Sequence, residues 1–150
     1  MPTAKEIMKT DVITVPPEMT VGELGRFLIE KNISGAPVVD SEGALVGIVT
    51  ENDLISRDKR LHIPTLLRVF DAYIALEPPS LIEKEIKKMA ALVVGDICTR
   101  DIITVKEDTQ LEDIASIMAE KRLNLVPVMR GKKMVGIVGK HEVLKAAGEI

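Results

Sequence analysis

The same succession of hydrophobic and polar stretches occurs twice along this chain. The β-branched run at 12–15 predicts a short strand, and two prolines directly after it predict a turn. Apolar residues recur at helical spacing from Leu24, and Thr20 with Glu23 forms the pattern of a capped helix start. A strand, a turn and an amphipathic helix are therefore expected in succession.

Two further apolar runs complete this first copy. Residues 36–40 and 45–50 are typical of strands joined by a tight turn, which contains Gly43. A second helix is predicted to begin at about Thr50. The order of elements in the copy is β-α-β-β-α.

The second copy repeats the first at a nearly constant spacing. Residues 7–15 match 97–105 at an offset of 90, and the Val-Gly-Ile-Val run at 46–49 returns at 135–138 at an offset of 89. The lost residue falls in the hairpin turn, where loops tolerate deletions. The same elements are predicted again, with a helix from about Thr109.

Each copy has an apolar face that three short strands and two helices cannot cover alone. Pairing the copies would bury both faces, which predicts an α/β (α+β) fold of two tandem units related by pseudo-twofold symmetry. The boundaries are expected at 1–57 for the first copy and 95–150 for the second, with an insert at 58–94.

The insert is too long for a simple loop. Apolar positions from Leu66 to Ile74 share one side of a predicted helix, and Ser80 with Glu83 starts another. We interpret the insert as a helical hairpin that adds packing or a dimer surface. A helix that docks on a membrane surface or on a partner is the alternative.

Composition narrows the function. A net charge of −3 disfavours binding of polyanions, and 2% aromatic residues cannot build a stacking platform for bases. A single cysteine suits a reducing compartment. The chain shows no secretory signal pattern and no apolar run of membrane-spanning length, so no membrane association and a cytoplasmic location are expected.

No catalytic constellation is visible in the sequence. His62 and His141 lack metal-ligand spacing with Cys98, and there is no phosphate-binding loop or nucleophile elbow. We therefore expect no enzyme, no metal site and no required cofactor.

Three motifs in order carry a family resemblance: "IMKTDVITV" at 7–15, "ISGAPVVD" at 33–40 and "LVGIVTENDL" at 45–54, with weaker counterparts in the second copy. On these motifs the chain resembles the tandem CBS-domain (Bateman module) proteins, from Ala4 to Ala146 apart from the insert. The resemblance implies a homodimer with clefts between the copies. Each cleft would bind an adenosine-containing regulatory ligand such as AMP, ADP, ATP or S-adenosylmethionine, and an unidentified protein would be regulated.

The resemblance also assigns residues. The acid of the exit motif would hold the ribose hydroxyls and its threonine the ribose or phosphate, which are Asp53 and Thr50 here. The adenine would lie against the opposite copy, with one set of residues for each cleft. These sets are Ile102, Ile103, Asn124, Leu125 and Pro127 for the Asp53 cleft, and Val12, Ile13, Ser34, Gly35, Ala36 and Pro37 for the other.

The chemistry of Thr50 and Asp53 allows two interpretations. A carboxylate can accept hydrogen bonds from two vicinal hydroxyls, and a helix start favours a phosphate. The same residues also suit helix capping alone, with Thr50 at the N-cap and Asp53 in the first turn.

The exit motif of the second copy differs at these two positions. Gly139 has no hydroxyl, and Glu142 is one methylene longer than Asp53. Lys140 and His141 could meet the phosphates of a nucleotide held by Asp53, or begin a solvated helix, while Glu142 could hold a ligand of its own. We expect Asp53→Ala to weaken binding more than Glu142→Ala.

Two other functions remain open at this point. The chain could be a structural dimerisation module with empty clefts, or a nucleic-acid binder that uses the lysine-bearing stretch at 83–91. The second is disfavoured because acids alternate with those lysines.

Overall fold

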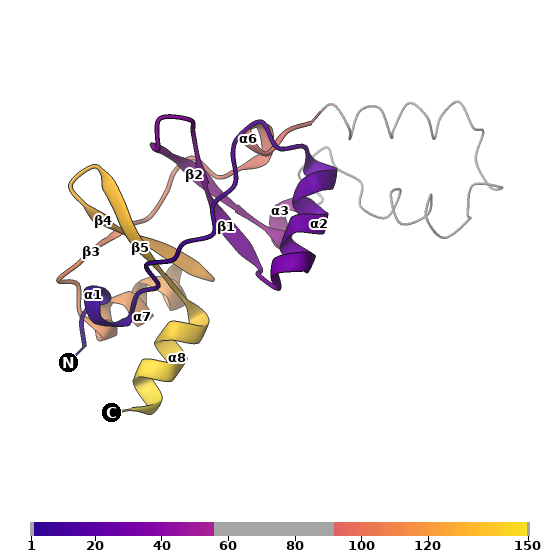
Figure 1. Ribbon diagram of the computed structural model, residues 1–150. Helices are drawn as coiled ribbons and strands as arrows, with labels where there is room; N and C mark the ends of the chain where they lie inside the picture. Colours follow the sequence, from indigo (N-terminus) through magenta and orange to yellow (C-terminus); the bar gives the residue numbers. More distant parts are fainter. Residues whose placement is uncertain (1, 56–91, 150) are drawn as a thin grey trace, which may run out of the picture.

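The computed structural model describes residues 2–55 and 92–149 (Figure 1). The predicted hairpin, including the stretch at 83–91, lies outside these residues except for its last three positions. The elements of the first copy are α2 (Val21–Lys31), β1 (Gly35–Val39), β2 (Leu45–Thr50) and α3 (Glu51–Ile55). The second copy comprises β3 (Val105–Lys106), α7 (Leu111–Lys121), β4 (Leu125–Arg130), β5 (Lys133–Gly139) and α8 (Lys140–Gly148).

Helix α2 begins where its capping residues predict. The Glu23 N–H donates to Thr20 Oγ1 at 3.2 Å, and the Thr20 N–H donates to Glu23 Oε1 at 3.1 Å. Hydrogen bonds from Thr20 also lower the pKa of the Glu23 carboxyl. The order of buried and exposed residues is the same in residues 21–30 of α2 and in residues 111–120 of α7. The repeat is therefore reproduced in the packing of both helices.

Helix α7 begins two residues later than its first predicted residue. Thr109 does not act as the N-cap, because its Oγ1 accepts the N–H of Lys106 at 3.0 Å in the preceding turn. Both long helices end at a residue in the left-handed conformation, Asn32 with φ 53° and Arg122 with φ 55°.

The two sheets confirm the hairpins but shorten the predicted first strand of both copies. β1 pairs with β2, and the second sheet has the order β3-β4-β5 with β3 parallel to β4. The strand predicted at 12–15 is reduced to one parallel bridge between Val15 and Val38, and only Val105 of its counterpart at 102–105 lies in β3. Beyond Val15 the ladder cannot continue, because Pro16 and Pro17 have no backbone N–H.

The two copies exchange their leading segments, residues 2–9 and 92–99. Each segment contains a one-turn helix that the sequence analysis missed, α1 (Ala4–Ile7) and α6 (Val94–Ile97). The Ala4 N–H donates to the Thr109 carbonyl at 2.8 Å, so α1 lies on the second copy, whereas Thr99 bridges to Ile48 of the first. Figure 1 shows α1 beside α7 and α6 beside β2.

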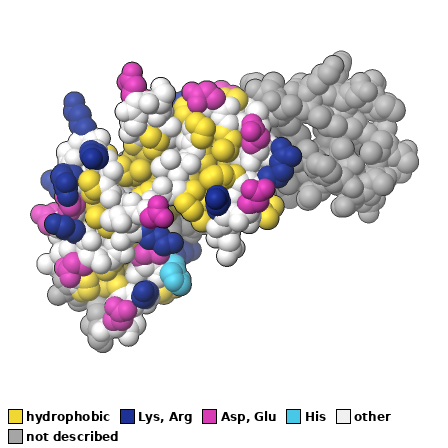
Figure 2. All heavy atoms as spheres, in the orientation of Figure 1, with side chains coloured by type: hydrophobic (Ala, Val, Ile, Leu, Met, Phe, Trp, Pro, Cys, Tyr) yellow, Lys and Arg dark blue, Asp and Glu magenta, His cyan; other side chains and the backbone are white. Residues whose placement is uncertain are grey.

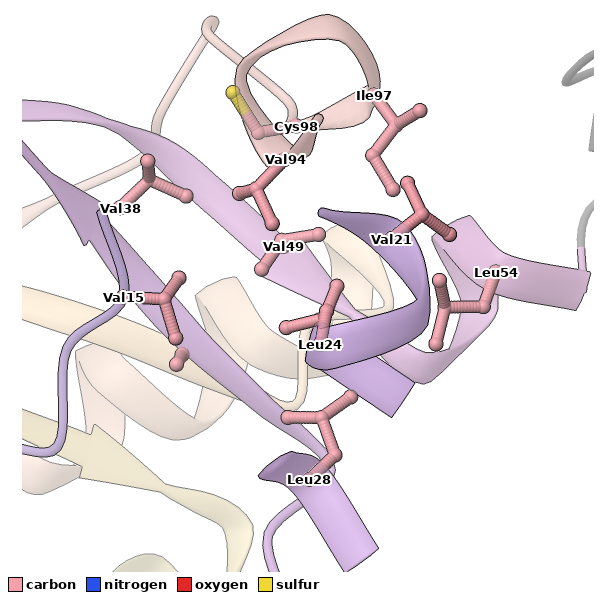
Figure 3. Packing of buried hydrophobic residues seen from close by; sticks show 11 residues of the cluster. Val15, Val21, Leu24, Leu28, Val38, Val49, Leu54, Val94, Ile97 and Cys98 are labelled. Carbon is pink, nitrogen blue, oxygen red and sulfur yellow. The ribbon is translucent and has the colours of Figure 1, made fainter. Parts of the chain in front are cut away.

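Each hydrophobic core is completed by the leading segment of the other copy. In the first core, Val94, Ile97 and Cys98 lie over side chains of the β1–β2 sheet, including Val38 and Val49 (Figure 3). The second core contains Ala4, and Ile7 and Met8 of the same leading segment pack against this core. The domain boundary predicted after residue 94 falls at the first residue of α6. The copies are therefore interlocked.

A glycine in each Val-Gly-Ile-Val run makes this exchange possible. A Cβ on Gly47 would lie 2.6 Å from the Thr99 carbonyl oxygen, and one on Gly136 would lie 2.9 Å from that of Lys9. Backbone from the leading segments approaches these strands too closely for a side chain. None of the described helices has the length and apolar character needed to cross a membrane.

Candidate functional site

Two clefts lie where the copies meet. The Asp53 cleft combines the exit motif of the first copy with the segment 99–103 and the loop before β4. The Glu142 cleft combines the exit motif of the second copy with the segment 9–13 and the loop before β1. Their volumes are about 160 Å³ and about 730 Å³ respectively. Only the second lies in the 300–1,000 Å³ range common for small-ligand pockets.

The structure brings most of the predicted residues together in the predicted pairing. Thr50 and Asp53 share their cleft with Ile102, Ile103, Asn124 and Leu125. Glu142 shares its cleft with Val12, Ile13, Ser34, Gly35 and Pro37.

Two predicted lining residues do not line either cleft. Ala36 is fully buried in the first core beside Val38, and Pro127 has less than 2% of its surface exposed. Ala36 is taken up by packing of the first core. Pro127 borders neither cleft, although its equally buried counterpart Pro37 borders the Glu142 cleft.

Further lining residues were missed by the sequence analysis although the repeat relates them. At matched positions, one member of each pair lines the Glu142 cleft and the other lines the Asp53 cleft. These pairs are Lys9 and Thr99, Asp11 and Asp101, Asn32 and Arg122, Ile33 and Leu123, and Ile137 and Ile48. Once the residues that line one cleft are known, the matched positions of the other copy identify these residues of the second cleft.

The acids of both exit motifs cap the helices on which they stand. The Thr50 N–H donates to Asp53 Oδ2 at 2.8 Å, and the Thr50 hydroxyl donates to the same oxygen at 3.4 Å. The Gly139 N–H donates to Glu142 Oε1 at 2.8 Å. In each half-buried carboxylate, one oxygen thus accepts the capping hydrogen bond. The other oxygen accepts no hydrogen bond within the described residues, so capping and ligand binding are compatible.

The second exit motif keeps its helix cap with a glycine and a longer acid. A Cβ on Gly139 would lie 3.0 Å from Glu142 Oε1, a tighter approach than Cβ atoms normally make. A threonine and a glutamate can nevertheless form such a cap together, as Thr20 and Glu23 do. The change from Thr50 and Asp53 to Gly139 and Glu142 therefore preserves the cap rather than abolishing it.

Lys140 and His141 line the Glu142 cleft and not the Asp53 cleft. They therefore stand beside Glu142 rather than beside Asp53, whose site they were expected to complete. The Lys140 N–H donates to the Asn124 carbonyl at 3.0 Å, which fixes the start of α8 on the Glu142 side. Arg122 is the cation that lines the Asp53 cleft.

A thin wall separates the clefts. Asn124 and Leu125 line both of them, and Glu51 lines the Glu142 cleft while its neighbours Thr50 and Asp53 line the other. A Cβ on Gly35 would lie 3.1 Å from Leu125 Cδ2. Ligands in the two clefts would therefore lie on either side of these residues.

The clefts combine aliphatic walls with a few polar groups, as small-ligand sites do. In 2–55 and 92–149, no charged or polar side chain is buried, and no cluster of His, Cys, Asp and Glu could hold a metal ion. Figure 2 shows charged side chains of both signs spread over one face, with apolar side chains between them. The arrangement can hold an apolar ring, a diol and an anion.

Comparison with known proteins identifies relatives over nearly the whole chain. CBSX1, a chloroplastic CBS domain-containing protein of Arabidopsis thaliana, is 32% identical over 95% of this chain and 61% of its own length. Inosine-5'-monophosphate dehydrogenase of Methanocaldococcus jannaschii is 32% identical over 95% of this chain and 23% of its own length. The chain thus spans less than two thirds of these curated relatives.

A solved structure has the same fold. The crystal structure of CBSX2 of Arabidopsis thaliana in complex with AMP matches with a TM-score of 0.74 and 28% identity, over 99% of this chain and 98% of that chain. Residues 4–60 and 94–149 each match the CBS domain family, in the two places where the repeat lies. The chain therefore belongs to the CBS domain family, as a tandem CBS-domain protein with an α+β fold.

Proposed function

We propose that this chain is a non-enzymatic regulatory module that binds an adenosine-containing ligand, such as AMP, ADP, ATP or S-adenosylmethionine, in the clefts between its copies. One observation carries the proposal: each cleft joins a capping carboxylate of one copy to aliphatic residues of the other. The AMP complex of CBSX2, whose crystallised chain has the same fold over 98% of its length, supports the adenosine moiety.

The residues suggest how such a ligand would be held. The carboxylate oxygen of Asp53 or Glu142 that is not used in capping would accept hydrogen bonds from the ribose hydroxyls. The aliphatic side chains of Ile102 and Ile103, or of Val12 and Ile13, would cover the adenine ring. Backbone groups of the loops before β1 and β4 would read its edge.

Calorimetric titration of the full chain tests this proposal. Adenosine, AMP, ADP, ATP and S-adenosylmethionine are titrated separately, with GMP as the control for base recognition. Binding of at least one adenosine compound is expected, and it should be lost in the double variant Asp53→Ala/Glu142→Ala. If none of the compounds produces heat at millimolar concentration, the proposal fails.

We also propose that the chain forms a homodimer, which is one way for ligand binding to be transmitted to an unidentified regulated protein. Large apolar side chains are exposed on the helices of both copies, with Ile29 81%, Ile55 61% and Leu144 71% exposed. Ile55 and Leu144 occupy matched positions of the repeat, so both ends of the module present the same apolar feature. A second copy would cover such faces.

The alternative is a purely structural dimerisation module, and the same exposed side chains favour it. Light scattering separates the two functions when it is combined with the titration. A dimer that is dispersed by Leu144→Asp but binds no adenosine compound would support the structural role alone. The cytoplasmic location stays a prediction, since CBSX1 is by its name chloroplastic.

A further inference from the structure

We propose that the exposed Ile29 side chain of one chain inserts into the apolar groove between α7 and α8 of a second copy, so that the two chains pair antiparallel. The first CBS copy of each chain would then face the second copy of its partner. This inference rests on the homodimer proposed above and assigns its orientation. The alternative is a parallel pairing, in which each copy faces its own counterpart.

The groove is a depression in the surface where α7 packs against α8. It has a volume of about 410 Å³, and most of the side chains that line it are aliphatic. Ala115 and Ala119 of α7 and Leu144 of α8 are among them. The two alanines are four residues apart, so they lie on the same face of α7 and leave this space open. An aliphatic side chain from another surface can enter it.

The repeat places a projecting side chain in the first copy where the second copy has this groove. Ile29 of α2 occupies the position matched to Ala119, and 81% of its surface is exposed. Ile55 of α3 is matched to Leu144 and is exposed as well. Figure 1 shows α2 apart from α7 and α8, so Ile29 does not reach the groove of its own chain. The projection and the groove can therefore meet only between two chains.

Complementarity of size favours the antiparallel pairing. Two first copies that faced each other would bring one exposed Ile29 against the partner's Ile29, and two second copies would leave groove against groove. In the antiparallel dimer each groove receives the partner's Ile29, and the twofold axis forms this contact twice. Filling a groove gives its lining residues van der Waals partners that an empty space lacks. The contact also covers an exposed apolar side chain in each chain.

Charge at the edge of the groove agrees with this pairing. Lys140 and Arg122 line the groove, and the first copy has Glu51 and Asn32 at the matched positions. The two pairs of helices carry the same net charge over matched positions, so the complementarity is local to this edge. Antiparallel pairing puts Glu51 on the same interface as the partner's Lys140. Parallel pairing puts Lys140 opposite the partner's Lys140, which is unfavourable.

Cysteine cross-linking of the full chain tests the orientation. Ile29→Cys and Ala119→Cys chains are co-expressed with different affinity tags and oxidised, so a disulfide between positions 29 and 119 can form only between chains. We expect a cross-linked mixed dimer, and no cross-linked dimer when either variant is expressed alone. Cys98 is buried, and the unaltered chain under the same oxidation is its control. Glu42→Cys, exposed in the β1–β2 turn, replaces Ile29→Cys in the matched control and should not cross-link.

An exchange of the two side chains measures how much this contact contributes to dimerisation. Ile29→Ala leaves the groove empty and Ala119→Ile obstructs it, so each should raise the Kd of the dimer at least about tenfold in analytical ultracentrifugation. The double variant moves the projection to α7 and the space to α2, and its Kd should return to within about threefold of that of the unaltered chain. Both positions are exposed in the single chain, so neither change should unfold it.

The possible failures are distinguishable from one another. Cross-linking of either cysteine variant expressed alone overturns the antiparallel pairing in favour of the parallel one. A dimer that cross-links in neither case, or in which the effects of the two exchanged side chains are additive, also overturns the proposal, because Ile29 then does not occupy the groove. A chain that is monomeric by light scattering overturns the proposal together with the homodimer. The proposed binding of adenosine compounds is measured separately by calorimetry and does not depend on these results.

Discussion

The two exit motifs cap the helices that follow them with different side chains. In the first copy Asp53 caps the backbone N–H of Thr50, and in the second Glu142 caps that of Gly139, at the same distance of 2.8 Å. The longer acid does not itself require glycine, because Thr20 and Glu23 form the same kind of cap at the start of α2. The cap is therefore kept in both exit motifs although the residues differ. The clefts above these caps differ in volume and in the charged residues that line them.

The largest expected effect tests the exchange of leading segments. Ala4→Asp and Val94→Asp each place a carboxylate at a fully buried position and should lower the free energy of unfolding by at least about 3 kcal/mol in urea titration. Hydrogen exchange should then rise in β4 and β5 for Ala4→Asp, and in β1 and β2 for Val94→Asp.

The milder pair Ile7→Ala and Val94→Ala serves if the aspartate variants do not fold. The exchange of leading segments is contradicted if protection from hydrogen exchange is lost in the copy to which the altered residue belongs by sequence.

A smaller loss is expected at the glycines that admit the exchanged segments. Gly47→Ala and Gly136→Ala each force a Cβ against backbone of the opposite leading segment, at a cost of about 1–3 kcal/mol in chemical unfolding. Gly22→Ala, on α2 with open space around it, is the control and should stabilise the chain slightly. Equal losses at Gly47 and Gly136 would show symmetric exchange, and an unaffected Gly136→Ala would contradict the close approach of Lys9.

The close approach of Gly139 and Glu142 predicts non-additive effects. Gly139→Thr crowds the carboxylate and should cost about 1 kcal/mol of stability, because the cap is displaced. Adding Glu142→Asp recreates the pair of the first copy and should recover most of that loss. A double-mutant cycle on thermal unfolding measures the coupling between the two positions. Additive losses would mean that the two residues do not form one unit.

The smallest effect concerns an ion pair that the second copy alone has at matched positions. Arg130 donates to both oxygens of Glu107, at 2.7 and 3.0 Å, which lowers the pKa of the Glu107 carboxyl. The first copy carries Pro17 and Asp40 at these places. A lowered acid pKa means that the stabilisation is present above the ordinary pKa of glutamate and is lost as the pH falls through it.

Unfolding of the chain and of Glu107→Gln should therefore differ slightly at neutral pH and converge towards about pH 3. The difference is small because Arg130 is exposed to solvent and Glu107 is only half-buried. A difference that grows on acidification would contradict the pairing.

Local patterns accounted for the elements whose causes lie within a few residues. Thr20 with Glu23 identified the start of α2, and the turn containing Gly43 identified the hairpin of the first copy. The same logic applied to Thr3 and Glu6 would have found α1, where the Thr3 N–H donates to Glu6 Oε1 at 3.3 Å. That the ladder ends at Val15 was also readable, because the prolines that follow are neighbours in sequence, but the loss of pairing at 12–14 and 102–104 was not.

Residue assignment within the clefts was partly predictable for a different reason. The repeat relates the copies, so the family resemblance could assign Ile102 and Ile103 to the same cleft as Asp53, and the structure places them there. It could not show that Ala36 is taken up by packing or that Pro127 borders neither cleft, since adjacent residues of a strand differ in what surrounds them.

The sequence by itself determined the repeat, the cap of α2, the hairpins and the acid of each exit motif, because these depend on neighbouring residues and on comparison between the copies. The tertiary structure decided that the leading segments are exchanged, that Lys140 and His141 stand with Glu142, and that this cleft is the larger one. These features depend on the approach of backbone and side chains about 50 positions or more apart, as between Ile48 and Thr99, where spacing along the chain sets no distance in space.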